Sequence, residues 1–525
     1  MAGDRVPAAA RVRGREGGAN ARLDAPVVGV VTLGCDKNTV DSERLMGTLA
    51  GAGARVRAGS EGADVLIVNT CGFIDAAREE SVDTILEAVR LKEEGHVGAV
   101  VALGCMVQRY GAELKSEIPE VDLFLGLTEL GDLVPQLRGR GLLPEAPAVP
   151  TMERPLRALA APATHTAHLK ISEGCDHACA FCAIPMMRGR HRSTPMSLLL
   201  AEARELEARG VVELSIVSQD TTWYGRDWVR AAAGAERGPR PAGTAAAGAA
   251  SGDGISPLYV GRSFAGMAGS HAAPTPASAA LPMDLPEGPL PRHGLLPHLL
   301  ERLVAETSIP WLRLFYMYPS GITPELVELI AGSRRILPYL DMPLQHASDR
   351  MLALMRRPER REVIRERVGW LRDAIDDLSL RTTVILGFPG ETDQDVDRLV
   401  ELLEEIRFDY LGAFAYSAEE GTPAASMPGR VPDAQVRERM ERVLDVQRGI
   451  THERNLERVG AARTVLIDEA ADAATGTHAI GRLAAQAPEV DGVVYVGGET
   501  AARPGDFVSV RVTGADEHDL SAEPA

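Results

Sequence analysis

Long apolar runs are absent from the 525-residue sequence. No stretch approaches the roughly 18 apolar residues that a helix needs to cross a bilayer, so we expect neither a membrane span nor a membrane partner. The first 24 residues carry five arginines but no apolar segment, which argues against a secretory signal. We expect residues 1–25 to be a disordered tail, with a transit peptide as the alternative, and the protein to be cytoplasmic.

Basic residues are also fewer than acidic ones. The chain has 56 lysines and arginines against 74 aspartates and glutamates, which gives a formal net charge of −18. Such a surface repels phosphate backbones, so we expect no stable nucleic-acid binding. A basic protein is the kind of macromolecular partner that this charge favours.

Cysteine occurs only six times, and nothing in the sequence indicates an oxidising compartment that would favour disulfides. The six residues divide into an N-terminal trio of Cys35, Cys71 and Cys105 and a loop trio of Cys175, Cys179 and Cys182. No cysteine is left over, which makes the two trios the first candidates for chemistry.

The N-terminal trio lies in a region, residues 26–145, in which apolar runs alternate with helical patterns. The runs are VVGVVTLG, DVLIVNT and VGAVVALG, and helical patterns follow at 42–50 and 76–92. Apolar runs without alternation are typical of parallel strands that are buried on both faces. The pattern therefore predicts a small doubly wound α/β domain.

The alternation of strand and helix patterns restarts at residue 168 and continues to 417. Six strand candidates are present: HLKISEG, VVELSIVSQD, WLRLFYMYP, YLDMPLQH, RTTVILGFPG and DYLGAFAYS. Helical patterns at 195–209, 324–330 and 393–406 separate some of them, and a polar helix is expected at 432–458. We predict an open (βα)6 barrel of the TIM-like kind within residues 160–458. Residues 230–293, rich in Ala, Gly, Pro and Ser, are expected to be a disordered insertion.

The remaining residues, 459–525, contain short β-like runs with Gly and Pro turns and predict a small β-barrel. Residues 465–525 hold eleven acids and three arginines, so this module is acidic, with 3 − 11 = −8. We expect the acidic surface to attract a basic protein. Reversing the charge of Asp491 and Asp506 is accordingly predicted to weaken substrate binding without abolishing cofactor cleavage.

The loop trio has the spacing C-x3-C-x2-C and follows a predicted strand, at the end where βα barrels carry their active sites. A four-iron cluster normally takes four cysteines, so three would leave one iron open for chemistry. The alternative is a structural zinc site completed by His177, although such sites usually have C-x2–4-C pairs that are well separated in the sequence.

The N-terminal trio is spaced by 36 and 34 residues, about one βα unit each. Each cysteine directly follows an apolar run, so all three should meet at the carboxyl edge of one parallel sheet, where doubly wound domains bind ligands. Three unrelated buried thiols are the alternative, because a free cysteine behaves as a small hydrophobe. The repeated position favours a second three-cysteine cluster.

GCDHACAFCAIP resembles the cluster loop of radical S-adenosylmethionine (SAM) enzymes, and the N-terminal trio resembles the additional cluster of the methylthiotransferases among them. The resemblance extends over nearly the whole chain outside the insertion. Further supporting strings are SQDTTWYG, YLDMPLQHAS, GFPGET and AYSAEEGTPAA. Within this family the chain is similar to the branch that modifies an aspartate of small-subunit ribosomal protein twelve. APEVDGVVY resembles that branch's version of the C-terminal TRAM module.

The resemblance implies two 4Fe-4S clusters, one on each trio, and two molecules of SAM per turnover. One SAM, cleaved with an electron from a donor such as flavodoxin or ferredoxin, gives a radical that abstracts hydrogen from the aspartate β-carbon. The second cluster presents sulfur, and the other SAM gives the methyl group. A cofactor radical is needed because an unactivated C–H bond offers neither an acidic proton nor a leaving group.

Further residues are weaker candidates for binding the cofactor, and each also has an ordinary structural explanation. The set comprises Phe181, Ser218, Gln219, Asp220, Gln345, Gly387, Gly390 and Glu391. Phe181 could flank the adenine or simply pack, and Asp220 could bind SAM or cap a helix. His346 ends the fourth strand beside Gln345, and Arg188 and Arg190 are candidate carboxylate binders.

Two rival functions remain at this point. A tRNA adenosine methylthiotransferase would use the same cofactors, but a TRAM module that binds RNA should be basic. A non-enzymatic metal-binding scaffold would hold zinc or one cluster and would carry out no adenosine chemistry.

Overall fold

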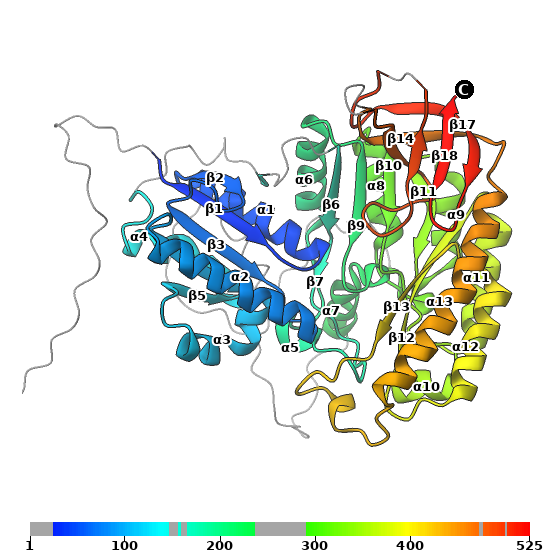
Figure 1. Ribbon diagram of the computed structural model, residues 1–525, viewed down its shortest axis with the longest axis horizontal. Helices are drawn as coiled ribbons and strands as arrows, with labels where there is room; N and C mark the ends of the chain where they lie inside the picture. Colours follow the sequence, from blue (N-terminus) through cyan, green and yellow to red (C-terminus); the bar gives the residue numbers. More distant parts are fainter. Residues whose placement is uncertain (1–24, 146–155, 159–164, 237–289, 472–475, 499–500) are drawn as a thin grey trace, which may run out of the picture.

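Three sheets organise the chain, as the computed structural model shows (Figure 1). The structure describes residues 25–145, 156–158, 165–236, 290–471, 476–498 and 501–525. The expected N-terminal tail and most of the expected insertion lie outside the described residues. Helix α7 (Arg226–Glu236) occupies the first part of the segment expected to be disordered, so that expectation was wrong for residues 230–236.

The N-terminal sheet has five parallel strands in the order β2-β1-β3-β4-β5. They are β1 (Val27–Thr32), β2 (Arg55–Ala58), β3 (Val65–Thr70), β4 (Ala99–Gly104) and β5 (Leu123–Gly126). Helices α1 (Asp36–Gly51), α2 (Asp75–Glu93), α3 (Cys105–Glu117) and α4 (Leu133–Gly139) connect and flank them. The predicted apolar runs are β1, β3 and β4, the three central strands.

The second sheet has six parallel strands in the order β13-β12-β11-β10-β9-β6 and is open, which confirms the predicted fold class. They are β6 (Thr166–Lys170), β9 (Glu213–Val217), β10 (Trp311–Leu314), β11 (Ile336–Asp341), β12 (Ser379–Leu386) and β13 (Tyr410–Ala415). A two-stranded hairpin, β7 (Ser172–Glu173) with β8 (Arg192–Ser193), flanks the cysteine loop.

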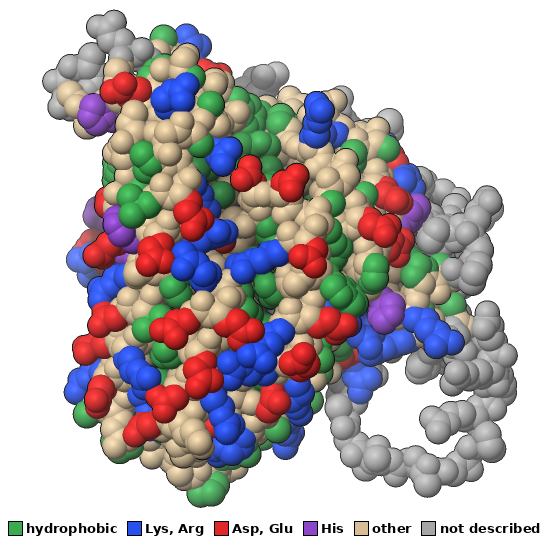
Figure 2. All heavy atoms as spheres, turned by 90° about the vertical axis from the view of Figure 1, so that its right-hand side faces the viewer, with side chains coloured by type: hydrophobic (Ala, Val, Ile, Leu, Met, Phe, Trp, Pro, Cys, Tyr) green, Lys and Arg blue, Asp and Glu red, His purple; other side chains and the backbone are tan. Residues whose placement is uncertain are grey.

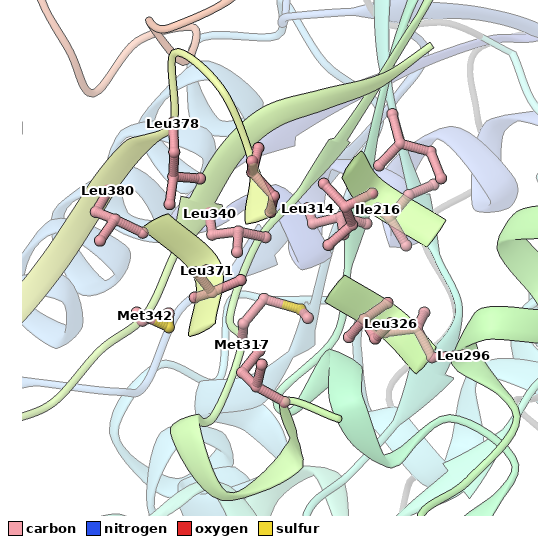
Figure 3. Packing of buried hydrophobic residues seen from close by; sticks show 14 of the residues in the cluster. Ile216, Leu296, Leu314, Met317, Leu326, Leu340, Met342, Leu371, Leu378 and Leu380 are labelled. Carbon is pink, nitrogen blue, oxygen red and sulfur yellow. The ribbon is translucent and has the colours of Figure 1, made fainter. Parts of the chain in front are cut away.

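Helices α6 (Met196–Ala208), α8 (Leu296–Glu306), α9 (Pro324–Gly332), α11 (Arg361–Ala374), α12 (Asp393–Ile406) and α13 (Asp433–Leu456) cover the outer face of this sheet. Helices α5 (Ile184–Arg188), α7 and α10 (Asp349–Leu354) lie toward the carboxyl ends of its strands (Figure 1). The largest core cluster lies between strands and helices, and Figure 3 shows Leu314 and Leu340 of the sheet near Leu326 of α9 and Leu371 of α11. Burial of such side chains, roughly 1.5–3 kcal/mol each, holds the helices on the sheet.

The face that carries α11, α12 and α13 mixes basic and acidic side chains (Figure 2). Many of these charges pair between helices, for example Arg361 with Glu401 at 3.0 Å and Arg442 with Asp397 at 2.8 Å. No described helix has the length and apolar character that crossing a membrane requires.

The C-terminal residues form a closed five-stranded barrel in the order β14-β15-β16-β18-β17. Its strands are β14 (Ala462–Glu469), β15 (Ala479–Leu483), β16 (Val494–Val496), β17 (Phe507–Ala515) and β18 (Leu520–Pro524). The barrel sits on the amino ends of the six parallel strands, opposite α5 and α7 (Figure 1). Buried ion pairs fasten it there: Glu213 of β9 lies 2.6 Å from Arg313 of β10 and 2.8 Å from Arg482 of β15.

Asp491 belongs to this interface and not to the acidic surface. Its side chain is fully buried, accepts a 2.8 Å hydrogen bond from the Tyr339 hydroxyl and lies 3.4 Å from Arg381. Reversing its charge would place a cation beside Arg381 inside this interface, so the prediction that Asp491 is a surface residue for substrate docking was wrong. Asp506, in contrast, is exposed.

Replacing Asp491 with asparagine should flatten the pH dependence of stability. Burial raises the pKa of Asp491 to about 6, so the folded state holds this proton more tightly than the unfolded chain does. Its stabilising contribution is complete below the unfolded pKa of 3.8 and is lost as the pH rises through about 6. Between these limits the wild type should lose about 2–3 kcal/mol relative to Asp491→Asn. Urea unfolding at several pH values measures this, and parallel curves would contradict it.

Candidate functional site

The N-terminal trio gathers at the carboxyl edge of the first sheet. Cys35 directly precedes α1, Cys71 directly follows β3, and Cys105 is the first residue of α3. The strands before them, β1, β3 and β4, are neighbours in the sheet. The three thiols influence one another electrostatically, as expected for groups that share one edge.

Two glycines make this close approach possible. A Cβ on Gly34 would lie 2.7 Å from the Cys71 Sγ, and one on Gly72 would lie 2.8 Å from the Met106 Cα. Gly34 also has a φ of 87°, a conformation that other residues adopt only at a cost. Glycine at these two positions therefore leaves room for the close approach at Cys71 and between the Gly72 turn and α3.

The loop trio lies at the carboxyl end of β6, between β7 and β8, where the sequence placed it. The loop is tied down by backbone hydrogen bonds from Cys175 N to Gly189 O (3.1 Å) and from Ala180 N to Met355 O (2.9 Å). Arg357, which is buried, lies near Cys179 and covers the ring of Tyr318 at 4.0 Å.

The thiols are poor acids in this environment. Burial raises the pKa of Cys105, Cys175 and Cys182 to about 12, and it raises that of Cys71 as well. At neutral pH such thiols keep their protons until a metal ion displaces them. Among the described residues, no three Cys, His, Asp or Glu side chains are grouped as ligands of a single metal ion. A four-iron cluster binds each thiolate to a different iron, so its ligands need not converge on one ion.

His177, the fourth ligand of the zinc alternative, is engaged elsewhere. Its Nε2 lies 2.7 Å from an Asp220 carboxylate oxygen. The ring is stacked between Trp223 and Tyr318, with centroid distances of 3.9 and 4.2 Å. These contacts position the cysteine loop and disfavour a role in zinc binding.

The two trios face each other across a domain contact. Helix α5, which begins two residues after Cys182, packs against α3, and Ala183 and Met187 contact Cys105. Arg188, at the end of α5, is buried and binds Asn38 of α1 (2.6 Å), Asp41 of α1 (3.0 Å) and Glu173 (2.7 Å). Arg188 does bind carboxylates, as predicted, but they are those of this chain; Arg190 is exposed.

A second buried ion cluster secures the other side of this contact. Glu419, in the segment after β13, is buried and pairs with Arg78 of α2 and, at 2.9 Å, with Arg109 of α3. Arg109 also donates a 2.6 Å hydrogen bond to the carbonyl of Glu420. The N-terminal domain is thus held against α5 on one side and against the segment after β13 on the other.

The predicted residues near the second strand have mixed outcomes. Asp220 accepts hydrogen bonds from Thr222 N (3.0 Å) and from the Thr222 hydroxyl (2.6 Å), so it caps the short 3₁₀ turn that follows. Ser218 hydrogen-bonds to the Ser172 hydroxyl. Gln219 differs, because its Oε1 is buried and has no partner among the described residues. Phe181 packs against the cluster that contains Met351 and Phe388.

The other predicted cofactor residues build turns. Gln345 has a φ of 72° and is bound through its backbone to Thr383 and Ile385 (both 2.8 Å). The Glu391 carboxylate accepts hydrogen bonds from Gly387 N (3.1 Å) and from Arg439 (2.9 Å). Gly390 N binds the carbonyl of Gly429 at 2.7 Å. His346 is fully buried, with its Nδ1 accepting from two backbone amides.

Sequence reasoning missed the residues beyond the end of β10. Tyr316 reaches the N-terminal trio, where its hydroxyl donates to Asp36 (3.3 Å), while Tyr318 lies beside the loop trio. A φ of 57° at Tyr316 breaks the strand geometry and sends the two rings to different sites. Two tyrosines just past a strand end were the only available signal.

Three families match parts of the chain. Residues 27–126 match the "Uncharacterized protein family UPF0004", residues 292–403 the "Radical SAM superfamily" and residues 459–524 the "TRAM domain". The first segment contains the strands of the N-terminal sheet, the second contains β10 to β12 of the six-stranded sheet, and the third contains the strands of the C-terminal barrel.

Full-length relatives decide the family. A protein from Anaeromyxobacter sp. (strain Fw109-5), named "Ribosomal protein uS12 methylthiotransferase RimO", is 41% identical over 93% of this chain and 91% of its own length. A protein of the same name from Desulforudis audaxviator is 39% identical over 95% of this chain and 97% of its own. The chain belongs to the RimO family of radical SAM methylthiotransferases. Membership of RimO in the radical SAM superfamily implies a 4Fe-4S cluster and S-adenosylmethionine.

Solved structures resemble this RimO-family chain only distantly. The radical SAM methyltransferase TsrM from Kitasatospora setae has a TM-score of 0.47 at 13% identity, covering 74% of this chain and 73% of its own. The functional conclusions below rest on the sequence relatives and on the geometry of the trios.

Proposed function

We propose that this enzyme converts an aspartate of ribosomal protein uS12 to 3-methylthioaspartate. The observation that carries the proposal is the pair of cysteine trios, which lie on opposite sides of one domain contact, with Cys105 touching the helix that follows Cys182. The named relatives act on uS12 and align over nearly the whole chain. Residues 26–145, 160–458 and 459–525 serve as its three domains.

Each trio holds one 4Fe-4S cluster in this proposal. Three thiols at each site leave one iron without a protein ligand, which suits the loop trio to binding SAM and the N-terminal trio to presenting sulfur. When bound, the clusters and two SAM molecules supply the one-electron chemistry that an unactivated C–H bond requires. The raised thiol pKa values fit buried cysteines that await a metal.

The protein's own side chains position these groups. Arg188 and Glu419 hold the N-terminal domain in place, and the pair of His177 and Asp220 braces the loop trio. Of the predicted cofactor contacts, Gln219 is the best candidate for touching SAM, because its buried Oε1 has no partner in the described part of the chain. Phe181, Ser218, Asp220, Gln345, Gly387, Gly390 and Glu391 would shape the pocket walls.

The substrate and the electron donor complete the proposal. The exposed acids of the TRAM barrel, including Asp506 and Glu523, suit a basic ribosomal protein better than RNA. Flavodoxin or ferredoxin would deliver the electron to the loop cluster. The protein would act in the cytoplasm, where ribosomal proteins are made.

Anaerobic reconstitution tests the proposal directly. The loaded enzyme, given SAM, dithionite and either uS12 or unmodified tRNA, should add one methylthio group to uS12 only, as read by intact mass and by fragment mapping to an aspartate. Methylthiolated adenosine with untouched uS12 would establish the tRNA alternative, and a protein that takes up zinc but cleaves no SAM would establish the scaffold.

A further inference from the structure

We propose that Lys37 binds the side-chain carboxylate of the target aspartate and so makes the enzyme selective for aspartate over asparagine. This inference rests on the proposed function, and it adds a residue that neither the motifs nor the family matches single out. It follows from where the Lys37 ammonium lies and from what else surrounds it.

Lys37 belongs to the N-terminal domain, but its side chain reaches the six-stranded sheet. It is two residues from Cys35, in the first turn of α1, and is 6% exposed. Its Nζ lies 3.0 Å from the ring centroid of Tyr316, just beyond the end of β10. The ammonium therefore stands beside the N-terminal trio and at the carboxyl mouth of the strands, where a substrate carbon must lie to be reached from both trios.

The other buried cations nearby are already occupied or lie at the loop trio. Lys170 and Arg188 both bind Asp41 and Glu173, and Arg188 also binds Asn38. Arg357 lies 3.3 Å from Glu359 and donates to the carbonyl of Pro343, but its Nη1 has no hydrogen-bond partner among the described residues. It lies beside the loop trio and Tyr318, so it belongs to the other site. Lys170 and Arg188 hold the protein together and have little donor capacity left for a ligand.

Lys37 contrasts with them. In the described part of the chain its polar contact is one oxygen of Asp36, at 3.2 Å, and its other neighbour is the face of the Tyr316 ring. An ammonium has three donors, so it can hold a second carboxylate without leaving the first. The Tyr316 hydroxyl also donates to Asp36, so Asp36 keeps a partner when the ammonium turns toward substrate.

The charges that face Lys37 from the sheet do not oppose an incoming carboxylate strongly. The acid on β11, Asp341, is buried and is neutralised by Arg381 at 3.1 Å. Burial raises the pKa of Asp341, which favours its uncharged form further. A carboxylate that arrives from solvent thus meets one ammonium in a largely dehydrated site, where a charge-assisted hydrogen bond is strongest.

A binding cycle tests the role of Lys37. The reconstituted holoenzyme and its Lys37→Met variant are titrated with two synthetic peptides of uS12, one with the target aspartate and one with asparagine in its place. The wild type should bind the aspartate peptide about 10-fold or more tightly, since hydrogen bonds to charged groups carry that much discrimination. In Lys37→Met the preference should disappear, because the cycle isolates this one contact.

Matched variants keep the result interpretable. Lys115→Met removes an exposed lysine of the same domain and should keep the full preference. Iron content shows whether Lys37→Met is loaded; should that variant fail to load, Lys37→Gln repeats the cycle with a side chain that can still bind Asp36. A preference for aspartate that survives loss of Lys37 overturns the inference. If wild-type enzyme leaves uS12 unmodified, the proposed function itself has failed.

Discussion

Cys175→Ala is expected to abolish formation of 5′-deoxyadenosine, whereas Cys71→Ala should leave it and stop methylthiolation of uS12. The two thiols belong to different domains and to different trios, on opposite sides of the α3–α5 contact. Loss of a loop ligand removes the site that binds and cleaves SAM, while loss of an N-terminal ligand removes only the sulfur-presenting site. Chromatography of adenosine products and the intact mass of uS12 read the two outcomes separately.

Iron analysis is the control for this division. Each variant should retain about half of the wild-type iron, because the remaining trio still binds its cluster. Equal loss of SAM cleavage in both variants at half iron content would show that the trios do not divide the work as proposed. A wild-type protein that never binds more than four irons per chain would contradict the proposal of a second cluster.

Arg313→Met should cost about 3–5 kcal/mol of unfolding free energy, the largest stability effect that we expect outside the metal sites. Arg313 is completely buried, lies 2.6 Å from Glu213 and donates a 2.8 Å hydrogen bond to the carbonyl of Ala484. Its removal leaves Glu213 with Arg482 as its remaining ion-pair partner among the described residues. It also removes the hydrogen bond that joins the sheet to Ala484 of the TRAM domain. Urea denaturation of the full chain measures the change.

The same substitution at an exposed pair is the matched control. Arg442 of α13 lies 2.8 Å from Asp397 of α12, with roughly half of each side chain exposed. Arg442→Met should change stability by no more than about 1 kcal/mol, since solvent screens such pairs. Equal losses in the two variants would mean that the TRAM interface contributes little to the stability of the chain.

Strands with a clear apolar pattern could be predicted from the sequence, whereas strands with many polar residues could not. All six strands of the second sheet overlap strand candidates of the sequence, and β1, β3 and β4 coincide with apolar runs, because strands buried on both faces need continuous hydrophobicity. The edge strand β2 reads RVRA and is mostly exposed, so it lacks that signal. Strands β15 and β18 of the C-terminal barrel were missed for a related reason, since GRL and AEP carry polar or turn-forming residues.

The candidate site was also predictable only in part. Cysteine spacing located both trios, because each follows a strand whose carboxyl end fixes its position in space. The residues that brace them come from elsewhere in the chain: Arg188 meets Asn38, and Glu419 meets Arg109. Contacts between residues so far apart in the sequence leave no local pattern that could predict them. Asp491 was misassigned for another reason: the sequence does not distinguish a buried acid from an exposed one.

The clamp of Arg188 and Glu419 means that the gap between the two trios is set by a joint between domains and not by either domain alone. A small rotation at that joint would change the reach from the site of radical generation to the site of sulfur storage while every iron kept its ligands. An enzyme loosened there would still consume its cosubstrate, but turnover would become futile: adenosine fragments would accumulate without modified product. If the two trios act as proposed, coupling of SAM cleavage to product formation depends on Arg188, Glu419 and their partners as well as on the cysteines.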